Sequence, residues 1–128
     1  MKTRLRLGAA SLALVLSVAA CDLGPDGPST ATGRITGHPA LGAAVLEVTW
    51  RGVVGFEGRG STQVYAAPVA GSPDVWRVVL LSPQISDLPF AVNVESSIME
   101  VPTITVVEAV NIGNHDVDVA PLEVSIER

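Results

Sequence analysis

Apolar and polar residues alternate along residues 41–50, LGAAVLEVTW. The even positions of this stretch are all apolar, being occupied by Ala44, Leu46, Val48 and Trp50. The odd positions mix small apolar residues with Glu47 and Thr49. Because successive side chains of a strand point to opposite faces, this period of two predicts a β-strand with one fully apolar face and one mixed face.

Similar short runs, rich in β-branched residues, follow along the chain and are separated by Gly, Pro, Asn and Asp. They are residues 52–58, 61–68, 75–82, 88–96, 103–112 and 116–127. No window from 34 to 128 carries the pattern of an amphipathic helix of useful length. The pattern predicts an all-β, antiparallel β-sandwich of about seven strands, with a closed barrel as the alternative.

Three of these runs carry finer information. In residues 75–82 both parities are apolar apart from Arg77, which predicts a central strand covered on both faces, or a strand crossing the middle of a sandwich. In residues 103–112 one parity is apolar, interrupted by Glu108. In residues 116–127 the apolar residues switch parity at Ala120-Pro121, which predicts a bulge or kink there.

The first 20 residues have the pattern of an export signal. Lys2, Arg4 and Arg6 give a basic start, and residues 7–20 are apolar or small. A bilayer-spanning helix needs about 20 apolar residues, whereas this run of roughly 14 ends at Cys21. We therefore expect residues 1–20 to be a cleaved signal peptide.

Cys21 is the only cysteine of the chain, so no disulfide can form within it. Val18-Ala19-Ala20-Cys21 resembles a bacterial lipobox. The resemblance implies that diacylglycerol is attached to the Cys21 thiol, that the leader is cut before it, and that a further fatty acid such as palmitate is added. Two or three acyl chains bury enough CH₂ groups, at about 0.8 kcal/mol each, to anchor a protein stably in a membrane. Asp22 resembles an inner-membrane retention signal, but the choice between the two envelope membranes stays open.

Residues 21–33 contain Gly, Pro, Ser, Thr and Asp and predict a flexible tether, followed by the β-sandwich domain at 34–128. After removal of residues 1–20, five arginines and no lysine face thirteen acidic residues, a formal charge of −8. An acidic domain repels nucleic acid and anionic head groups, so we expect neither nucleic-acid binding nor electrostatic membrane binding.

The chain offers little for catalysis, and we expect a protein that is not an enzyme and has no cofactor. His38 and His115, the two histidines, both lie beside turn residues and are not spaced as a pair of metal ligands. None of the serines lies in a Gly-x-Ser-x-Gly turn. The glycines of residues 51–60 lack the Gly-Lys-Ser/Thr ending of a phosphate-binding loop.

Residues 111–118, NIGNHDVD, bring together oxygen donors that Ca²⁺ could accept, on Asn111, Asn114, Asp116 and Asp118. Their spacing does not match the Ca²⁺ loop of an EF-hand, and Asn and Asp after Gly are also typical of a tight turn. The sequence favours the turn, with Ca²⁺ binding left open.

Aromatic residues are few, and most are expected in the core. Exposure of Trp50, Tyr65 or Trp76 on a concave face would favour binding of a glycan or another small ligand. Burial of all three would favour binding of a protein.

The order of the segments is similar to that of cohesin-like and carbohydrate-binding-module-like sandwiches of bacterial surface proteins. The similar segments are residues 41–50, WRVVLLSP at 76–83, and the closing pair of strands at 102–127 around an Asn/Asp turn. The resemblance implies an Ig-like or cohesin-like jelly roll and an adhesion or scaffolding role, and it transfers no site residues. The resulting hypothesis is a lipid-anchored, non-enzymatic protein of the bacterial cell envelope, facing the periplasm or the exterior, whose β-sandwich serves protein interaction or structural scaffolding, with an envelope protein or a glycan as the partner. The alternative is a small-ligand or glycan-binding module.

Overall fold

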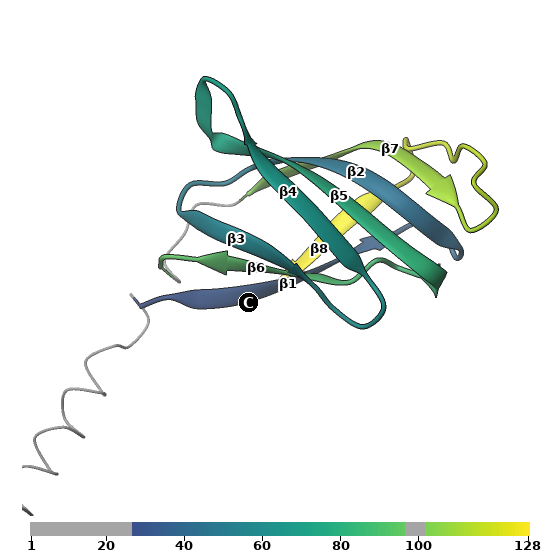
Figure 1. Ribbon diagram of the computed structural model, residues 1–128, viewed down its shortest axis with the longest axis horizontal. Helices are drawn as coiled ribbons and strands as arrows, with labels where there is room; N and C mark the ends of the chain where they lie inside the picture. Colours follow the sequence, from purple (N-terminus) through teal and green to yellow (C-terminus); the bar gives the residue numbers. More distant parts are fainter. Residues whose placement is uncertain (1–26, 97–101) are drawn as a thin grey trace, which may run out of the picture.

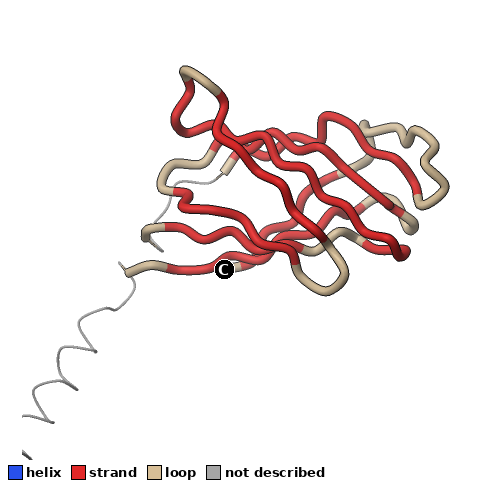
Figure 2. The backbone as a smooth tube through the Cα atoms, viewed as in Figure 1, coloured by secondary structure: helices blue, strands red, loops and turns tan. Residues whose placement is uncertain are grey.

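The computed structural model describes residues 27–96 and 102–128, and in this part of the chain eight strands form two four-stranded antiparallel sheets (Figures 1 and 2). Sheet A has the order β3-β6-β1-β8 and sheet B the order β4-β5-β2-β7. The sheets pack face to face, so the predicted antiparallel β-sandwich is confirmed. The strands are β1 (Ser29–Thr36), β2 (Leu41–Thr49), β3 (Val53–Gly58), β4 (Gln63–Val69), β5 (Ser72–Ser86), β6 (Phe90–Val94), β7 (Thr103–Asn111) and β8 (Glu123–Glu127).

The even positions of β2 point into the sandwich, as their alternation predicts. Ala44, Leu46 and Val48 are buried, and so is Trp50 directly after the strand. The opposite layer of the core comes from sheet A, chiefly from Ile35 and from the inward positions of β6. Each fully buried aliphatic or aromatic side chain contributes about 1.5–3 kcal/mol relative to an exposed one.

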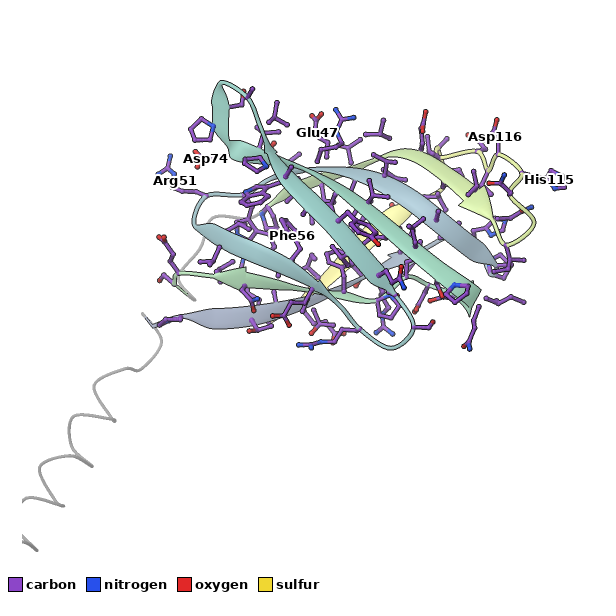
Figure 3. All side chains as sticks on the ribbon, viewed as in Figure 1. Glu47, Arg51, Phe56, Asp74, His115 and Asp116 are labelled. Carbon is purple, nitrogen blue, oxygen red and sulfur yellow. The ribbon has the colours of Figure 1, made fainter. Side chains whose placement is uncertain are left out.

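Phe56 and Trp76 join the two sheets toward the end of the sandwich where β2 leads into β3, since Trp76 pairs with Val48 near the end of β2. Their ring centroids lie 5.4 Å apart in an edge-to-face arrangement, and Phe56 lies between the two sheets in Figure 3. Such aromatic pairs contribute about 0.5–1.5 kcal/mol beyond the free energy gained by burying their surface. This contact therefore stabilises the packing of the two sheets at this end of the sandwich.

Strand β1 begins at Ser29, so residues 29–33 belong to the sandwich and not to the tether expected at 21–33. Composition alone hid the first part of this strand, because the inward positions of residues 29–33 carry small residues. Ala31 and Gly33 face the core and alternate with exposed Thr30 and Thr32. Gly33 leaves room for the ring of Phe90, which a side chain at position 33 would occupy.

Strand β5 lies inside sheet B, between β4 and β2, but it is covered on one face only. Val78 and Leu80 are buried, whereas Val79 is half-buried and Leu81 is 38% exposed. The expectation of a strand covered on both faces is therefore wrong, while the alternative of a strand crossing the middle of a sandwich is consistent with its position.

Strand β7 carries a bulge that corrects the expected faces of residues 103–112. Val45 is opposite Glu108 while Leu46 is opposite Val106, so Val107 is the extra residue. Before the bulge an even position, Val106, is buried, and after it an odd position, Ala109, is buried. A bulge inserts one residue, which turns the following side chains to the other face of the sheet.

A bulge or kink was predicted at Ala120-Pro121, where the apolar residues switch parity. The structure has a turn there, in which the Leu122 amide donates to the carbonyl of Val119 at 3.0 Å. Val117 and Val119 pack against the core from outside the regular strands, and Leu122 is buried. Only the last part of the expected strand, β8, pairs regularly, with β1. The described ranges, 27–96 and 102–128, contain no helix that is long and apolar enough to cross a membrane.

Candidate functional site

Polar side chains that bind one another occupy most of the outer face of sheet A, and Val54 of the edge strand β3 is the large apolar residue that the described part of this sheet exposes. Thr30 Oγ1 donates to Asn93 Oδ1 at 3.0 Å, and Asn93 Nδ2 donates to Glu57 Oε1 at 3.2 Å. Arg34 lies between Asp87 and Glu127, with N–O distances of 4.0 and 3.7 Å. These groups are exposed and satisfied within the face, so the outer face of sheet A is suited to contact with water.

The outer face of sheet B is different, because apolar side chains occupy its centre. They come from all four strands, and we call this set the sheet B face: Ala43, Val45, Tyr65, Val79, Leu81 and Val110. Tyr65 is 60% exposed and Leu81 38% exposed, and the others are half-buried. Exposed apolar patches that span several strands and carry a polar rim mark binding surfaces.

Strand register places these side chains in rows that run across the sheet. The first row contains Tyr65, Val79, Val45 and Glu108. The second row contains Gln63, Leu81, Ala43 and Val110. The third row contains Ala67, Arg77, Glu47 and Thr105. Residues of one row lie on the same face because each is the cross-strand partner of its neighbour.

Two shallow hollows lie on this face. One of about 120 Å³ is lined by Ala43, Val45, Val79, Glu108 and Val110, together with Ala44 and Ala109. The other, of about 260 Å³, extends past Leu81 and Ile112 to the 111–114 turn. The small side chain of Ala43 lines both hollows and forms a depression beside the projecting Leu81.

Charged residues border the apolar centre. Arg77 Nη2 donates to Glu47 Oε2 at 3.0 Å, and both side chains are nearly half exposed, at 49% and 45% (Glu47 is labelled in Figure 3). An exposed pair of this kind contributes at most about 1 kcal/mol to folding. Glu108 adds a carboxylate at the β7 end of the first row, opposite the end that Tyr65 occupies. Polar rims of this kind surround the apolar centre of protein interfaces.

The two histidines lie in turns, as expected. His38 is half-buried, and its Nδ1 accepts a hydrogen bond from the Ala40 amide at 3.1 Å. His115 is exposed on the outer loop at one end of the molecule, where Figure 3 labels it beside Asp116. Within residues 27–96 and 102–128, no three His, Cys, Asp or Glu side chains gather in a way that could hold a metal ion.

The candidate Ca²⁺ loop at 111–118 is organised as a turn. Asn111 Oδ1 accepts from the amides of Gly113 and His115, at 2.9 and 3.0 Å. Asp118 Oδ1 accepts from the Ala120 amide at 3.1 Å. Asn114 adopts a left-handed φ of 64°, which Asn tolerates better than most residues. The side-chain oxygens of Asn111 and Asp118 thus stabilise the local backbone.

Trp50, Tyr65 and Trp76, whose exposure distinguishes the ligand-binding from the protein-binding hypothesis, differ in how far they are buried. Trp50 is buried, Trp76 is half-buried against Phe56, and Tyr65 is exposed on the sheet B face. Burial of all three rings, the pattern expected for protein binding, is therefore not met, and the exposed Tyr65 meets the exposure part of the pattern expected for ligand binding.

A further hollow, of about 340 Å³, opens between β7 and β8, where the edges of the two sheets meet. Ile104, Val124 and Ile126 line it, together with Arg128. The guanidinium carbon of Arg128 lies 5.7 Å from the centre of the Trp50 ring. Trp50 Nε1 is buried and has no hydrogen-bond partner among the described groups.

Cys21, the predicted lipidation site, lies outside the described residues, as do the expected signal peptide and the start of the tether. Sequence reasoning also did not identify the sheet B face, since it placed both faces of residues 75–82 in the interior. Arg77 is the signal that could have found it, because a charged residue on one parity of a strand favours solvent on that side.

Comparison with known proteins gave one structural similarity. No protein-family model matches the chain, and no curated protein sequence matches it significantly. A solved structure that it resembles is a cohesin module from a family 33 glycoside hydrolase of Clostridium perfringens, with a TM-score of 0.48 and 13% identity over 81% of this chain and 96% of that one. The class of protein that the fold and its surfaces define is an antiparallel β-sandwich in which sheet B exposes an apolar centre on its outer face.

Proposed function

We propose that this chain is a non-enzymatic, lipid-anchored protein of the bacterial cell envelope that binds another protein through the sheet B face. The observation that carries the proposal is the contrast between the two outer faces of the sandwich. Sheet A presents threonines and paired charges to solvent, whereas sheet B presents an apolar centre with Tyr65 and Leu81 exposed. A protein that functions alone in water has no need for this asymmetry.

The composition of the sheet B face favours a protein partner over a glycan. Sugars bind by stacking on aromatic rings, and Tyr65 is the one aromatic side chain that the described part of the face exposes. Aliphatic residues around one tyrosine, with Arg77 and Glu47 at the rim, are typical of protein interfaces.

The anchor proposed at Cys21 fits this role. The residues between Cys21 and the start of β1 at Ser29 are too few to carry the domain far from a membrane, at about 3.3–3.6 Å per residue when fully extended. The sandwich would remain near the bilayer surface, so its partner must lie within reach of that surface.

Site-specific photo-cross-linking in intact bacteria tests the proposal. A photoreactive phenylalanine analogue replaces Tyr65 in one variant and Thr32, on the outer face of sheet A, in the control. We expect a discrete protein adduct from position 65 and none from position 32. Equal labelling from both positions, or no adduct from position 65, would contradict the use of this face.

A second candidate function is binding of a small apolar ligand in the hollow between β7 and β8. The side chains of Ile104, Val124 and Ile126 in its lining favour this function. Ile126→Trp should fill this hollow. If the hollow binds a ligand, a tryptophan fluorescence titration with a fatty acid should show saturation in the wild type and not in this variant.

A further inference from the structure

We infer that the protein bound by the sheet B face is a second copy of this chain, in a symmetric dimer whose two-fold axis runs between β5 and β2, parallel to these strands. This inference rests on the proposed function, because it takes the sheet B face to be an interface. It adds the identity of the partner and the orientation in which the two copies meet.

The arrangement follows from the strand order. Sheet B has four strands, with β5 and β2 at its centre and β4 and β7 at its edges. A two-fold axis between the central strands places β5 over β2 of the second copy, and β4 over β7. Every side chain of a row therefore meets its own row partner on the other copy, as a symmetric interface requires.

The apolar residues of the two central strands match under this operation, while Val110 on the edge strand lies opposite Gln63. Val79 lies opposite Val45 of the second copy, and these two residues already form a cross-strand pair within one sheet. Leu81 lies opposite Ala43, so a projecting side chain meets the smallest residue of its row. The hollow of about 120 Å³ beside Ala43 offers space for it. Two sheets that pack face to face, about 10 Å apart, interdigitate their side chains in this way.

The charged residues match as well. Arg77 lies opposite Glu47 of the second copy, and Glu47 lies opposite Arg77, so the pair within each chain becomes a network of four charges. Tyr65 lies in the row of Glu108, so its hydroxyl faces a carboxylate of the second copy. Rotation about an axis across the strands would instead bring the third row, with Arg77 and Glu47, over the apolar second row. Charge pairing thus selects the axis that runs along the strands.

The same axis suits two chains anchored in one membrane. Because the axis runs along the strands of sheet B, it keeps the same end of both sandwiches together. The two β1 strands then begin at the same end of the dimer, and both tethers lead toward one surface (one copy is shown in Figure 1). The face is modest in size, and confinement to a membrane raises the effective concentration of the partner.

A charge exchange between two copies tests the inference. Two full-length copies with different tags are expressed in the same cells, and one tag is captured from detergent-solubilised membranes while the other is quantified. Wild-type copies should recover each other. Arg77→Glu in both copies, or Glu47→Arg in both, brings like charges together and should reduce recovery roughly tenfold. One Arg77→Glu copy with one Glu47→Arg copy restores two opposite-charge contacts and should restore recovery.

The control is Arg34→Glu in both copies, which reverses a charge on the outer face of sheet A and should leave recovery unchanged. Restoration in the mixed pair requires both variants to be folded, so misfolding cannot mimic it. Failure of wild-type copies to recover each other, or of the mixed pair to recover, overturns the inference. In that case an adduct of Tyr65 with a different protein would leave the proposed function standing, whereas no adduct at all would remove both.

Discussion

Gly33 lies directly beneath the ring of Phe90, so that a Cβ at position 33 would be 2.5 Å from Phe90 Cζ and 2.9 Å from Ile126 Cδ1. The glycine belongs to β1, Phe90 to β6 and Ile126 to β8, so this one position sets how closely three strands of sheet A pack. Phe90 is fully buried and belongs to the hydrophobic core.

Gly33→Ala is therefore expected to destabilise the protein by about 1–3 kcal/mol, the usual cost of overpacking a core. Urea unfolding followed by tryptophan fluorescence measures this loss. Gly55→Ala is the matched control, because a Cβ there meets no atom within 4 Å. Its free energy of unfolding should stay within about 0.5 kcal/mol of the wild type or rise slightly. Equal losses in the two variants would contradict the packing seen around Gly33.

Leu46 and Leu81 lie on adjacent strands of sheet B but on opposite faces. Leu46 is fully buried, so Leu46→Ala should cost about 2–5 kcal/mol of stability. Leu81 is 38% exposed, and Leu81→Ala should cost less than about 1 kcal/mol. Thermal or urea unfolding of both variants, at a concentration where the chain is monomeric, checks the difference, and a large loss for Leu81→Ala there would show that its face is covered within the folded chain.

The contrast between these two leucines also shows how far the sequence predicts the fold. Alternation predicted the buried face of β2 correctly, since its even positions are all apolar and its odd positions are mixed. In β5 both parities are apolar, and periodicity cannot separate a face buried in the core from a face that is kept apolar for binding. The candidate binding face was missed for this reason.

Two other differences have local physical causes. Strand β1 escaped prediction because Ala31 and Gly33, which face the core, are as small as tether residues. The faces of β7 were wrong beyond Val106 because a bulge at Val107 inserts a residue, while the apolar Val110 and Ile112 beyond it lie at even positions, so the expected parity continued unbroken apart from Glu108. Both features depend on neighbouring strands that are distant in sequence.

Asn111 is expected to act as the organising residue of the 111–118 turn. Its side-chain oxygen accepts two backbone amides, so Asn111→Ala should destabilise the protein by about 1–2 kcal/mol, whereas Asn111→Asp should retain most of the stability. Asn114→Gly is the control, because glycine adopts the left-handed φ of this position without strain. Its melting temperature should not fall.

The same turn should not require Ca²⁺. Since Asn111 Oδ1 is already hydrogen-bonded to two amides, millimolar CaCl₂ should leave the melting temperature unchanged relative to the same protein in EDTA. A rise in melting temperature that is lost in Asp116→Asn would contradict this and would assign a Ca²⁺ site to the loop.

Cys21 is expected to carry the lipid anchor, which predicts that cells expressing the full-length chain incorporate radiolabelled palmitate into it. Cys21→Ala removes the only thiol of the chain, so the label should disappear and the protein should leave the membrane fraction. Ser17→Ala, four residues earlier in the leader, keeps the thiol and should retain the label. Gel autoradiography of immunoprecipitated protein, with membrane and soluble fractions compared, measures both effects. An unlabelled wild-type protein, or label that persists in Cys21→Ala, would contradict lipid attachment at this cysteine.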